Sequence, residues 1–141
     1  MTVRSTRSYA PPLHPLHAVL LAFSFPLFLG ALASDLTYFQ TYQVQWANFS
    51  SWLIAGALLG SAFALVWALA DMIRYRATRA LKLSVYFVLL LVMWILGFVN
   101  ALVHAKDAWA TMPAGLYLSI VTAALALVAT LTGHARTRAR R

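Results

Sequence analysis

Two chemically active residue types are missing from this sequence, which contains no cysteine and no glutamate. Without cysteine the chain has no disulfide, no thiol redox centre and no thiolate metal site. The acidic groups are reduced to Asp35, Asp71 and Asp107, and only 10% of the residues are charged. Soluble domains are typically about one quarter charged. The shortage of charge therefore argues against an ordinary soluble fold.

Apolar residues take the place of charge, at 62% of the chain with a mean hydropathy of +0.77. They fall into four runs at about 12–34, 49–72, 81–103 and 113–132. Each run is near the length at which an α-helix, rising 1.5 Å per residue, crosses about 30 Å of hydrocarbon. The 141 residues leave almost nothing for a soluble domain. The sequence predicts one all-α domain over 1–141, a four-helix antiparallel transmembrane bundle.

The basic residues predict the orientation of this bundle. Ten of the eleven Lys and Arg residues lie before the first run, between the second run and the start of the third, where Lys82 lies, or after the fourth, and Lys106 is the exception. The positive-inside rule then predicts that both termini are cytoplasmic, in a multi-pass protein of the bacterial inner membrane. Trp46, Trp52 and Trp109 fit an aromatic belt at the outer interface. Because the basic residues adjoin apolar runs, we expect the bilayer as partner and no nucleic acid.

A cleavable signal peptide is the alternative interpretation of the first run. Arg4 and Arg7 precede it, and the triplet 31–33, Ala-Leu-Ala, fits a cleavage site. The run is about 22 residues long, whereas the core of a signal peptide has roughly 7–15. The length favours a retained helix.

Helical spacing places the small and polar residues of each run on one face. The four faces consist of His14, His17, Leu21, Ser24, Phe28, Ala31 and Asp35; of Gly56, Gly60, Ala64, Trp67 and Asp71; of Tyr86, Leu90, Met93, Gly97, Asn100 and His104; and of Gly115, Ser119, Thr122, Ala126, Ala129 and Gly133. Lipid offers no partner to polar groups, so these faces should turn toward the bundle interior. The GxxxG spacing from Gly56 to Gly60 favours close helix packing.

The ionisable residues form two groups at opposite ends of the predicted bundle. His14, His17, Asp71 and His134 belong to the cytoplasmic end. Asp35, His104 and Asp107 belong to the outer end, with Asn100 about one turn deeper. These residues either lie at the membrane interface and fix the depth of the helices, or they form a site.

A b-type haem is the sharper hypothesis for the cytoplasmic group. Two imidazoles from different helices can serve as axial ligands, which here pairs His14 or His17 with His134. Asp71 would accept the second N–H of one imidazole. No HExxH, GxSxG or P-loop pattern occurs, so we assign no catalytic residue and no metal site and expect no enzymatic activity.

Four features follow one another along the chain in a fixed order. They are the dipeptide His14-Pro15, the aspartates Asp35 and Asp71 that close the first two runs, and Gly133 near the end of the fourth. In this order the chain resembles a bacterial membrane family, domain of unknown function 2231, over about residues 13–135. The resemblance implies a multi-pass inner-membrane protein whose molecular role is unassigned. It singles out His14, Asp35 and Asp71 as positions to test.

Three functions are compatible with these patterns. The first is a small structural or accessory subunit that binds another membrane protein, or a second copy, through its small-residue faces. The second is a haem-binding redox protein, and the third is a small proton-linked permease that uses Asp35 and Asp71. The middle of the bilayer would offer such a permease only Ser24, Ser119 and Thr122, so it ranks third. Substrate, oligomeric state and organism do not follow from the sequence.

Overall fold

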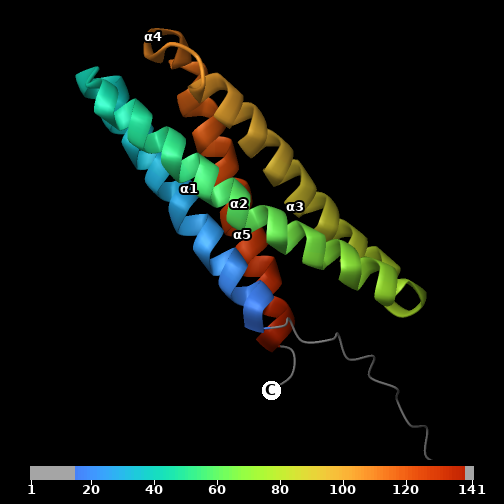
Figure 1. Cartoon of the computed structure of the whole chain (residues 1–141). Helices are drawn as coiled ribbons and strands as arrows, with labels where there is room; N and C mark the ends of the chain where they lie inside the picture. The colour runs from blue at the N-terminus through green and yellow to red at the C-terminus, as the bar shows by residue number, and fades with distance from the viewer. Residues whose placement is uncertain (1–14, 139–141) are drawn as a thin grey trace, which may run out of the picture.

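The structure is a computed structural model, and it describes residues 15–138, apart from the side chains of residues 76–80, 82 and 136–138. The elements are α1 (Pro15–Thr41), α2 (Val44–Arg74), α3 (Arg76–His104), α4 (Ala108–Thr111) and α5 (Ala114–Arg138). Four helices are long and apolar enough to cross a membrane, and α4 is a short turn between α3 and α5 (Figure 1). The predicted all-α bundle of four membrane-length helices is confirmed.

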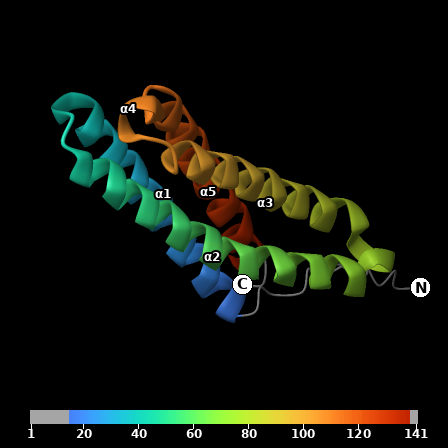
Figure 2. The ribbon, with the colours of Figure 1, turned by 45° about the horizontal axis from the view of Figure 1, so that its top comes forward.

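The four long helices form a ring in which each packs against its two neighbours. Helix α1 contacts α2 and α5, and α3 contacts the same two, so α1 and α3 are diagonal partners across the bundle (Figures 1 and 2). We call the end where α1 begins, α2 meets α3 and α5 finishes the basic end. The other end, where α1 meets α2 and α4 lies, is the α4 end. In both views the tip formed by α2 and α3 lies apart from the start of α1.

The first connection is much shorter than the polar break at residues 35–48 suggests. Helix α1 continues to Thr41 and α2 begins at Val44, which leaves Tyr42 and Gln43 to make the turn. The added helical turn buries Tyr38, and its apolar contacts offset the polar composition of the segment. Tyr42 adopts the left-handed conformation, with φ 55°, and its ring stacks on Trp109 at a centroid distance of 5.9 Å.

The helix faces predicted from the sequence form the core. Every described member of the first, third and fourth faces is buried. The glycines of the second face lie against α1, because a Cβ on Gly56 would lie 3.3 Å from Leu27 Cδ1 and one on Gly60 3.1 Å from Ser24 Oγ. The fully buried stripe of α2 is rotated from that face, and it consists of Ala47, Ser50, Ile54, Ala57, Gly60, Ser61, Ala64 and Ala68.

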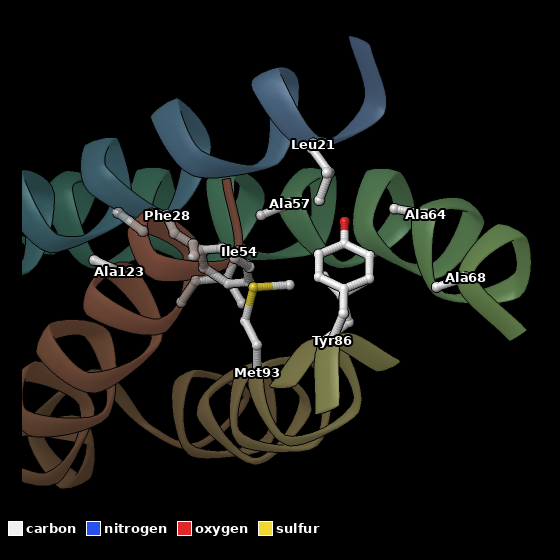
Figure 3. Packing of buried hydrophobic residues seen from close by; sticks show 13 residues of the cluster. Leu21, Phe28, Ile54, Ala57, Ala64, Ala68, Tyr86, Met93 and Ala123 are labelled. Atoms are coloured by element: carbon white, nitrogen blue, oxygen red, sulfur yellow. The ribbon is translucent and has the colours of Figure 1, made fainter. Parts of the chain in front are cut away.

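An apolar layer fills the middle of the bundle. Phe28, Ile54, Leu90 and Met93 are all buried there, and Figure 3 shows Met93 directed toward Phe28 and Ile54. Gly97 makes room for this layer, since a Cβ at that position would lie 3.0 Å from Phe28 Cζ. The layer separates buried polar groups at the two ends of the bundle.

Candidate functional site

A cluster of polar side chains lies inside the bundle at the α4 end, and all four membrane-length helices contribute to it. Asp35 comes from α1, Ser50 from α2, Asn100 and His104 from α3, and Ser119 from α5. His104 is 8% exposed and the other four are 0% exposed. A buried carboxyl group between membrane spans is costly unless it is paired, so such a cluster marks a functional site by default.

Four of these residues form a closed ring of hydrogen bonds, which we call the polar ring. Ser119 Oγ donates to Asp35 Oδ2, and Asn100 Nδ2 donates to Ser119 Oγ over 2.9 Å. Asp35 Oδ1 lies 2.9 Å from His104 Nε2. The ring closes where His104 Nδ1 lies 3.0 Å from the backbone oxygen of Asn100.

The partners in the polar ring fix the positions of its protons. A carbonyl oxygen can only accept, so His104 Nδ1 carries a proton and donates it to Asn100. Ser119 receives a bond from Asn100 and gives its own proton to Asp35. A hydrogen bond between Asp35 Oδ1 and His104 Nε2 then requires one further proton between these two atoms. The pair is either a carboxylic acid beside neutral imidazole or a carboxylate beside imidazolium, and its net charge is zero in both cases.

The packing around His104 leaves little freedom to the imidazole. A Cβ on Gly115 would lie 2.8 Å from His104 Cε1 and 2.8 Å from Thr111 Cγ2, so only glycine fits beneath the ring. Ser50 Oγ donates to the backbone oxygen of Ala31 over 3.3 Å and lies 3.4 Å from His104 Nε2. The imidazole is therefore held by α1, α2 and α5 as well as by its own helix.

This arrangement differs from a hydrolase triad. In a triad the carboxylate and the serine contact opposite nitrogens of the imidazole, so that the imidazole can take the serine proton. Here Asp35 and Ser50 both face Nε2 of His104, and Nδ1 is committed to the backbone. Ser119 donates to the carboxyl group instead. The geometry supports the holding and exchange of a proton rather than nucleophilic attack.

The polar ring has one unused acceptor. Asn100 Oδ1 is buried and, within the part of the chain that the structure describes, receives no hydrogen bond. The other polar atoms of the Asn100 side chain and of Asp35 are engaged in the ring. The ring can therefore accept one more donor at this point without losing any existing bond.

A second polar pair joins α1 and α3 at the basic end. His17 Nε2 lies 2.8 Å from Tyr86 Oη, both side chains are buried, and the rings of His17 and Trp67 form a T-shaped pair at a centroid distance of 6.4 Å. Figure 3 shows the Tyr86 phenol reaching from α3 toward α1. Gly133 of α5 leaves space for this phenol, since a Cβ there would lie 3.3 Å from Tyr86 Oη.

The two cross-bundle pairs are equivalent in register. Each joins residues that are 69 apart in sequence, His17 with Tyr86 and Asp35 with His104. The two residues that α1 contributes, His17 and Asp35, are about five turns apart at 3.6 residues per turn, and so are Tyr86 and His104 in α3. The two residues of each helix therefore lie on the same face of that helix. The diagonal helices α1 and α3 are thus tied together at both ends of the bundle.

The remaining candidate residues have different surroundings. His14 lies outside the described residues. His134 is half-buried in α5, where its Nδ1 lies 2.8 Å from the backbone oxygen of Thr130. Asp71 is half-buried one turn before the end of α2, and Asp107 is exposed just before α4.

The basic end offers poor space for a haem. An iron bound to His17 Nε2 would displace Tyr86 Oη. The porphyrin plane would also have to enter between α1, α3 and α5 beside Gly133, where even an added methyl group would lie 2.8 Å from Leu21 Cδ1. Between residues 15 and 138 no group of three or more His, Cys, Asp or Glu residues is arranged to hold a metal ion. A porphyrin ligated through His17 Nε2 would require these helices to separate, and the pairing of His14 with His134 stays a prediction because His14 lies outside the described residues.

Sequence reasoning listed Asp35, Asn100 and His104 as polar candidates, and the structure brings these three together. It placed Ser119 on a packing face and among the few polar groups in the middle of the bilayer, without linking it to Asp35, and it gave Ser50 no role. A signal for Ser50 exists, since it lies on the stripe that continues through Ala47 and Ile54 of α2. The partnership of His17 with Tyr86 had no signal in either helix alone, because the two residues lie on diagonal helices.

The fold and the polar ring define a small multi-pass α-helical membrane protein with ionisable groups in its core. Comparison with protein families is consistent with this class. The chain belongs to the family described as "Predicted membrane protein (DUF2231)", whose model matches residues 13–137. No curated protein and no solved structure matches the chain. The family description names the membrane and no activity, so a function has to be argued from the site.

Proposed function

We propose that this protein is a small accessory membrane protein whose helix packing responds to the protonation of Asp35 and His104. The observation that carries the proposal is the 2.9 Å contact between Asp35 Oδ1 and His104 Nε2, inside a ring built by α1, α3 and α5. A change of protonation at this pair acts on three helices at once. A partner membrane protein that binds the bundle would then sense the change in helix packing.

Each change of protonation alters both charge and bonding. Removal of the shared proton leaves a carboxylate beside an imidazole lone pair, two acceptors that face each other without a donor. Addition of a proton creates an imidazolium beside a carboxylic acid, which is a buried positive charge without a counter-ion. Either state is costly in a dry core, and the bundle lowers the cost by moving the helices or admitting water.

Protons reach the polar ring most directly through His104. It is the last residue of α3, and it is 8% exposed as a whole residue although its side chain is only 1% exposed, while the other four residues of the cluster are 0% exposed. The charged groups nearest to it in sequence are Lys106 and Asp107, both exposed. Exchange therefore occurs from the α4 end.

A proton-linked permease is less well supported. The apolar layer at Phe28, Ile54 and Leu90 lies between the polar ring and the His17–Tyr86 pair. Ser24 and Thr122 lie near this level, but each donates its hydroxyl proton to a backbone oxygen of its own helix. Transport across the membrane would need a polar path through this layer.

The distribution of basic residues supports a bacterial inner-membrane location with both termini in the cytoplasm. In that orientation the α4 end and its polar ring face the outer side of the membrane. The pair would then respond to the pH outside the cell.

Nuclear magnetic resonance on isotope-labelled protein in lipid nanodiscs tests the proposal directly. The chain has four histidines and three acidic residues, all aspartate, so the ring nitrogens of His104 and the carboxyl carbon of Asp35 can be assigned by substitution. We expect both signals to change together in a single pH titration. The variant Asp35→Asn should abolish this shared titration, and Asp107→Asn, at an exposed acid, should leave it intact.

A paired measurement tests whether protonation changes helix packing. Because the chain has no native cysteine, spin labels can be placed at Phe39→Cys in α1 and Leu102→Cys in α3, both exposed near the α4 end. The distance between the labels should shift over the same pH range and should stay constant in the Asp35→Asn background. Signals of Asp35 and His104 that stay unchanged at every pH at which the helices persist would overturn the proposal and leave the ring as a structural lock.

A further inference from the structure

Asn100 lies inside the bundle with one half of its side-chain amide unused. It is 0% exposed, and its Nδ2 donates to Ser119 Oγ over 2.9 Å. Its Oδ1 receives no hydrogen bond from the part of the chain that the structure describes. Nearly all buried amide oxygens in proteins accept at least one hydrogen bond, from the protein or from an ordered water. The unused oxygen therefore marks a place for a hydrogen-bond donor.

The facing side chains of α1 and α3 fill the least volume at the level of Asn100. The two cross-bundle pairs are each 69 residues apart, and the same offset places Ala31 opposite Asn100. It also places Phe28 opposite Gly97, and a Cβ on Gly97 would indeed lie 3.0 Å from Phe28 Cζ. Every other pair that this offset makes on the two faces contains a large side chain, whereas Ala31 and Asn100 are both small. Ala31 is 1% exposed, so this level is closed to the lipid and suits only a small molecule.

A second buried acceptor follows Ser119 on α5. Thr122 is 0% exposed, and its hydroxyl donates to the backbone oxygens of Leu118, over 2.9 Å, and Ser119, over 3.2 Å. Because the hydroxyl proton is used in this way, Thr122 Oγ1 can only accept a further bond. Thr122 lies three residues after Ser119, on the same face of α5 and one turn closer to the middle of the bundle. The interior thus has two acceptors at neighbouring levels, Asn100 Oδ1 and Thr122 Oγ1.

We propose that one internal water molecule binds between α3 and α5 and donates its two protons to Asn100 Oδ1 and Thr122 Oγ1. Both protein atoms are acceptors, so the site selects a small neutral molecule with two donors. A cation at this point would add a buried charge, and the only nearby carboxyl group, that of Asp35, is already engaged with His104 and Ser119. Water meets the requirements of size, charge and bonding.

The water gives the polar ring a fixed direction. The amide oxygen and nitrogen of asparagine are nearly the same size, so the side chain can turn over without a change in packing. A turned amide would direct Oδ1 at Ser119 and compete with Asp35 for the serine proton. A water that donates to Oδ1 opposes this, and Asn100 keeps donating to Ser119, whose proton stays directed at Asp35. The binding of this water does not depend on the change of protonation proposed for Asp35 and His104.

Nuclear magnetic resonance of the full chain in lipid nanodiscs tests the proposal, because the sequence has only two asparagines, Asn48 and Asn100. Asn48 is exposed at the start of α2 and serves as an internal control. With asparagine labelled with nitrogen-15, we expect through-space transfer of magnetisation from water to the side-chain amide of Asn100. In the rotating frame this transfer has the opposite sign to transfer by proton exchange, which should dominate at Asn48. Its absence at Asn100 would overturn the proposal.

Oxygen-17 relaxation dispersion observes the water oxygen itself, so exchanging hydroxyl protons of the protein do not contribute. Asn100→Leu should remove one long-lived water from the native count. Thr122→Val keeps the shape of the side chain and should shorten the lifetime of that water about two- to tenfold, the range for the loss of one hydrogen bond.

The same helix supplies a matched control. Thr130→Val changes a half-buried hydroxyl of α5 that donates to the backbone oxygen of Ala126 over 2.8 Å, and it should alter neither the count nor the lifetime. A lifetime that is unchanged in Thr122→Val would overturn the proposal, since the water would then be held by other groups. An equal effect of Thr122→Val and Thr130→Val would overturn it as well, because it would show a general loosening of α5.

Discussion

His104 and Asn100, one helical turn apart on α3, are connected twice. The direct connection runs from His104 Nδ1 to the Asn100 backbone oxygen over 3.0 Å. The longer one leaves the Asn100 side chain, passes through Ser119 and Asp35, and returns to His104 Nε2. Because the bonds form a ring, the loss of one side chain removes one hydrogen bond from each of its two neighbours, and the members should be coupled energetically.

The polar ring distinguishes between two replacements of Asp35. Asp35→Asn should keep stability close to that of the native protein, because the amide oxygen can accept from Ser119 and the amide nitrogen can donate to a neutral His104. Asp35→Leu should lower the free energy of unfolding by about 2–4 kcal/mol, because it leaves two buried groups unsatisfied. Thermal unfolding in detergent, followed by circular dichroism, measures both. A Leu variant as stable as the Asn variant would contradict the ring.

Ser119 and Asn100 should behave as a coupled pair. Ser119→Ala removes the group that joins Asn100 to Asp35 and should cost about 0.6 kcal/mol, and at most about 1.7 kcal/mol, which are the average and the maximum for hydrogen bonds between membrane helices. In a double-mutant cycle with Asn100→Ala, the two losses should sum to more than the loss in the double variant. Strict additivity would show that the two side chains act independently. Thr132→Ala, at an exposed hydroxyl, serves as the control.

Gly115 should tolerate no side chain, whereas Gly56 should tolerate one. Gly115→Ala places a methyl group 2.8 Å from His104 Cε1, and the imidazole is held by several partners, so we expect a loss of about 1–3 kcal/mol from overpacking. The methyl of Gly56→Ala meets only the end of Leu27, at 3.3 Å, and that flexible side chain can move. The comparison is made by thermal unfolding. An equal effect of the two variants would contradict the rigid placement of His104.

Tyr86→Phe should destabilise the basic end through the loss of its hydrogen bond to His17. The variant keeps the aromatic ring in the core and removes the hydroxyl 2.8 Å from His17 Nε2, with an expected cost of about 1 kcal/mol. Tyr117→Phe removes an exposed hydroxyl from α5 and should have no effect. Hydrogen exchange at the backbone of α1 locates the change. Faster exchange confined to the α4 end would contradict the assignment.

The orientation can be measured because the chain has no cysteine. A single cysteine at Thr41→Cys, exposed at the end of α1, should react with an impermeant thiol reagent in intact cells. One at Thr78→Cys, in the basic first turn of α3, should react only after the membrane is opened. Labelling of Thr78→Cys alone in intact cells would invert the orientation and place the polar ring on the cytoplasmic side.

Helical periodicity was sufficient to predict most of the core, because in a lipid environment a face with small or polar residues has no alternative to the bundle interior. Phe28, Leu90 and Thr122 all follow from spacing alone. Periodicity gave no account of the turn at Tyr42, since the polar residues before it are those of a loop and only the burial of Tyr38 shows why the helix continues. It placed Asp35 and His104 on interior faces but could not pair them, because the pairing depends on which helices are diagonal.

The diagonal pairing has a consequence for the order in which the protein is made. Asp35 emerges from the ribosome 69 residues before His104 and 84 before Ser119. The hairpin of α1 and α2 therefore enters the membrane with its buried carboxyl group lacking both ring partners. Insertion scales assign an aspartate in a membrane helix a cost of about 3 kcal/mol at the centre, and Asp35, nearer the helix end, carries part of it. The first half of the chain is thus an incomplete product that the second half stabilises, and truncation before α5 should leave a substrate for membrane quality control.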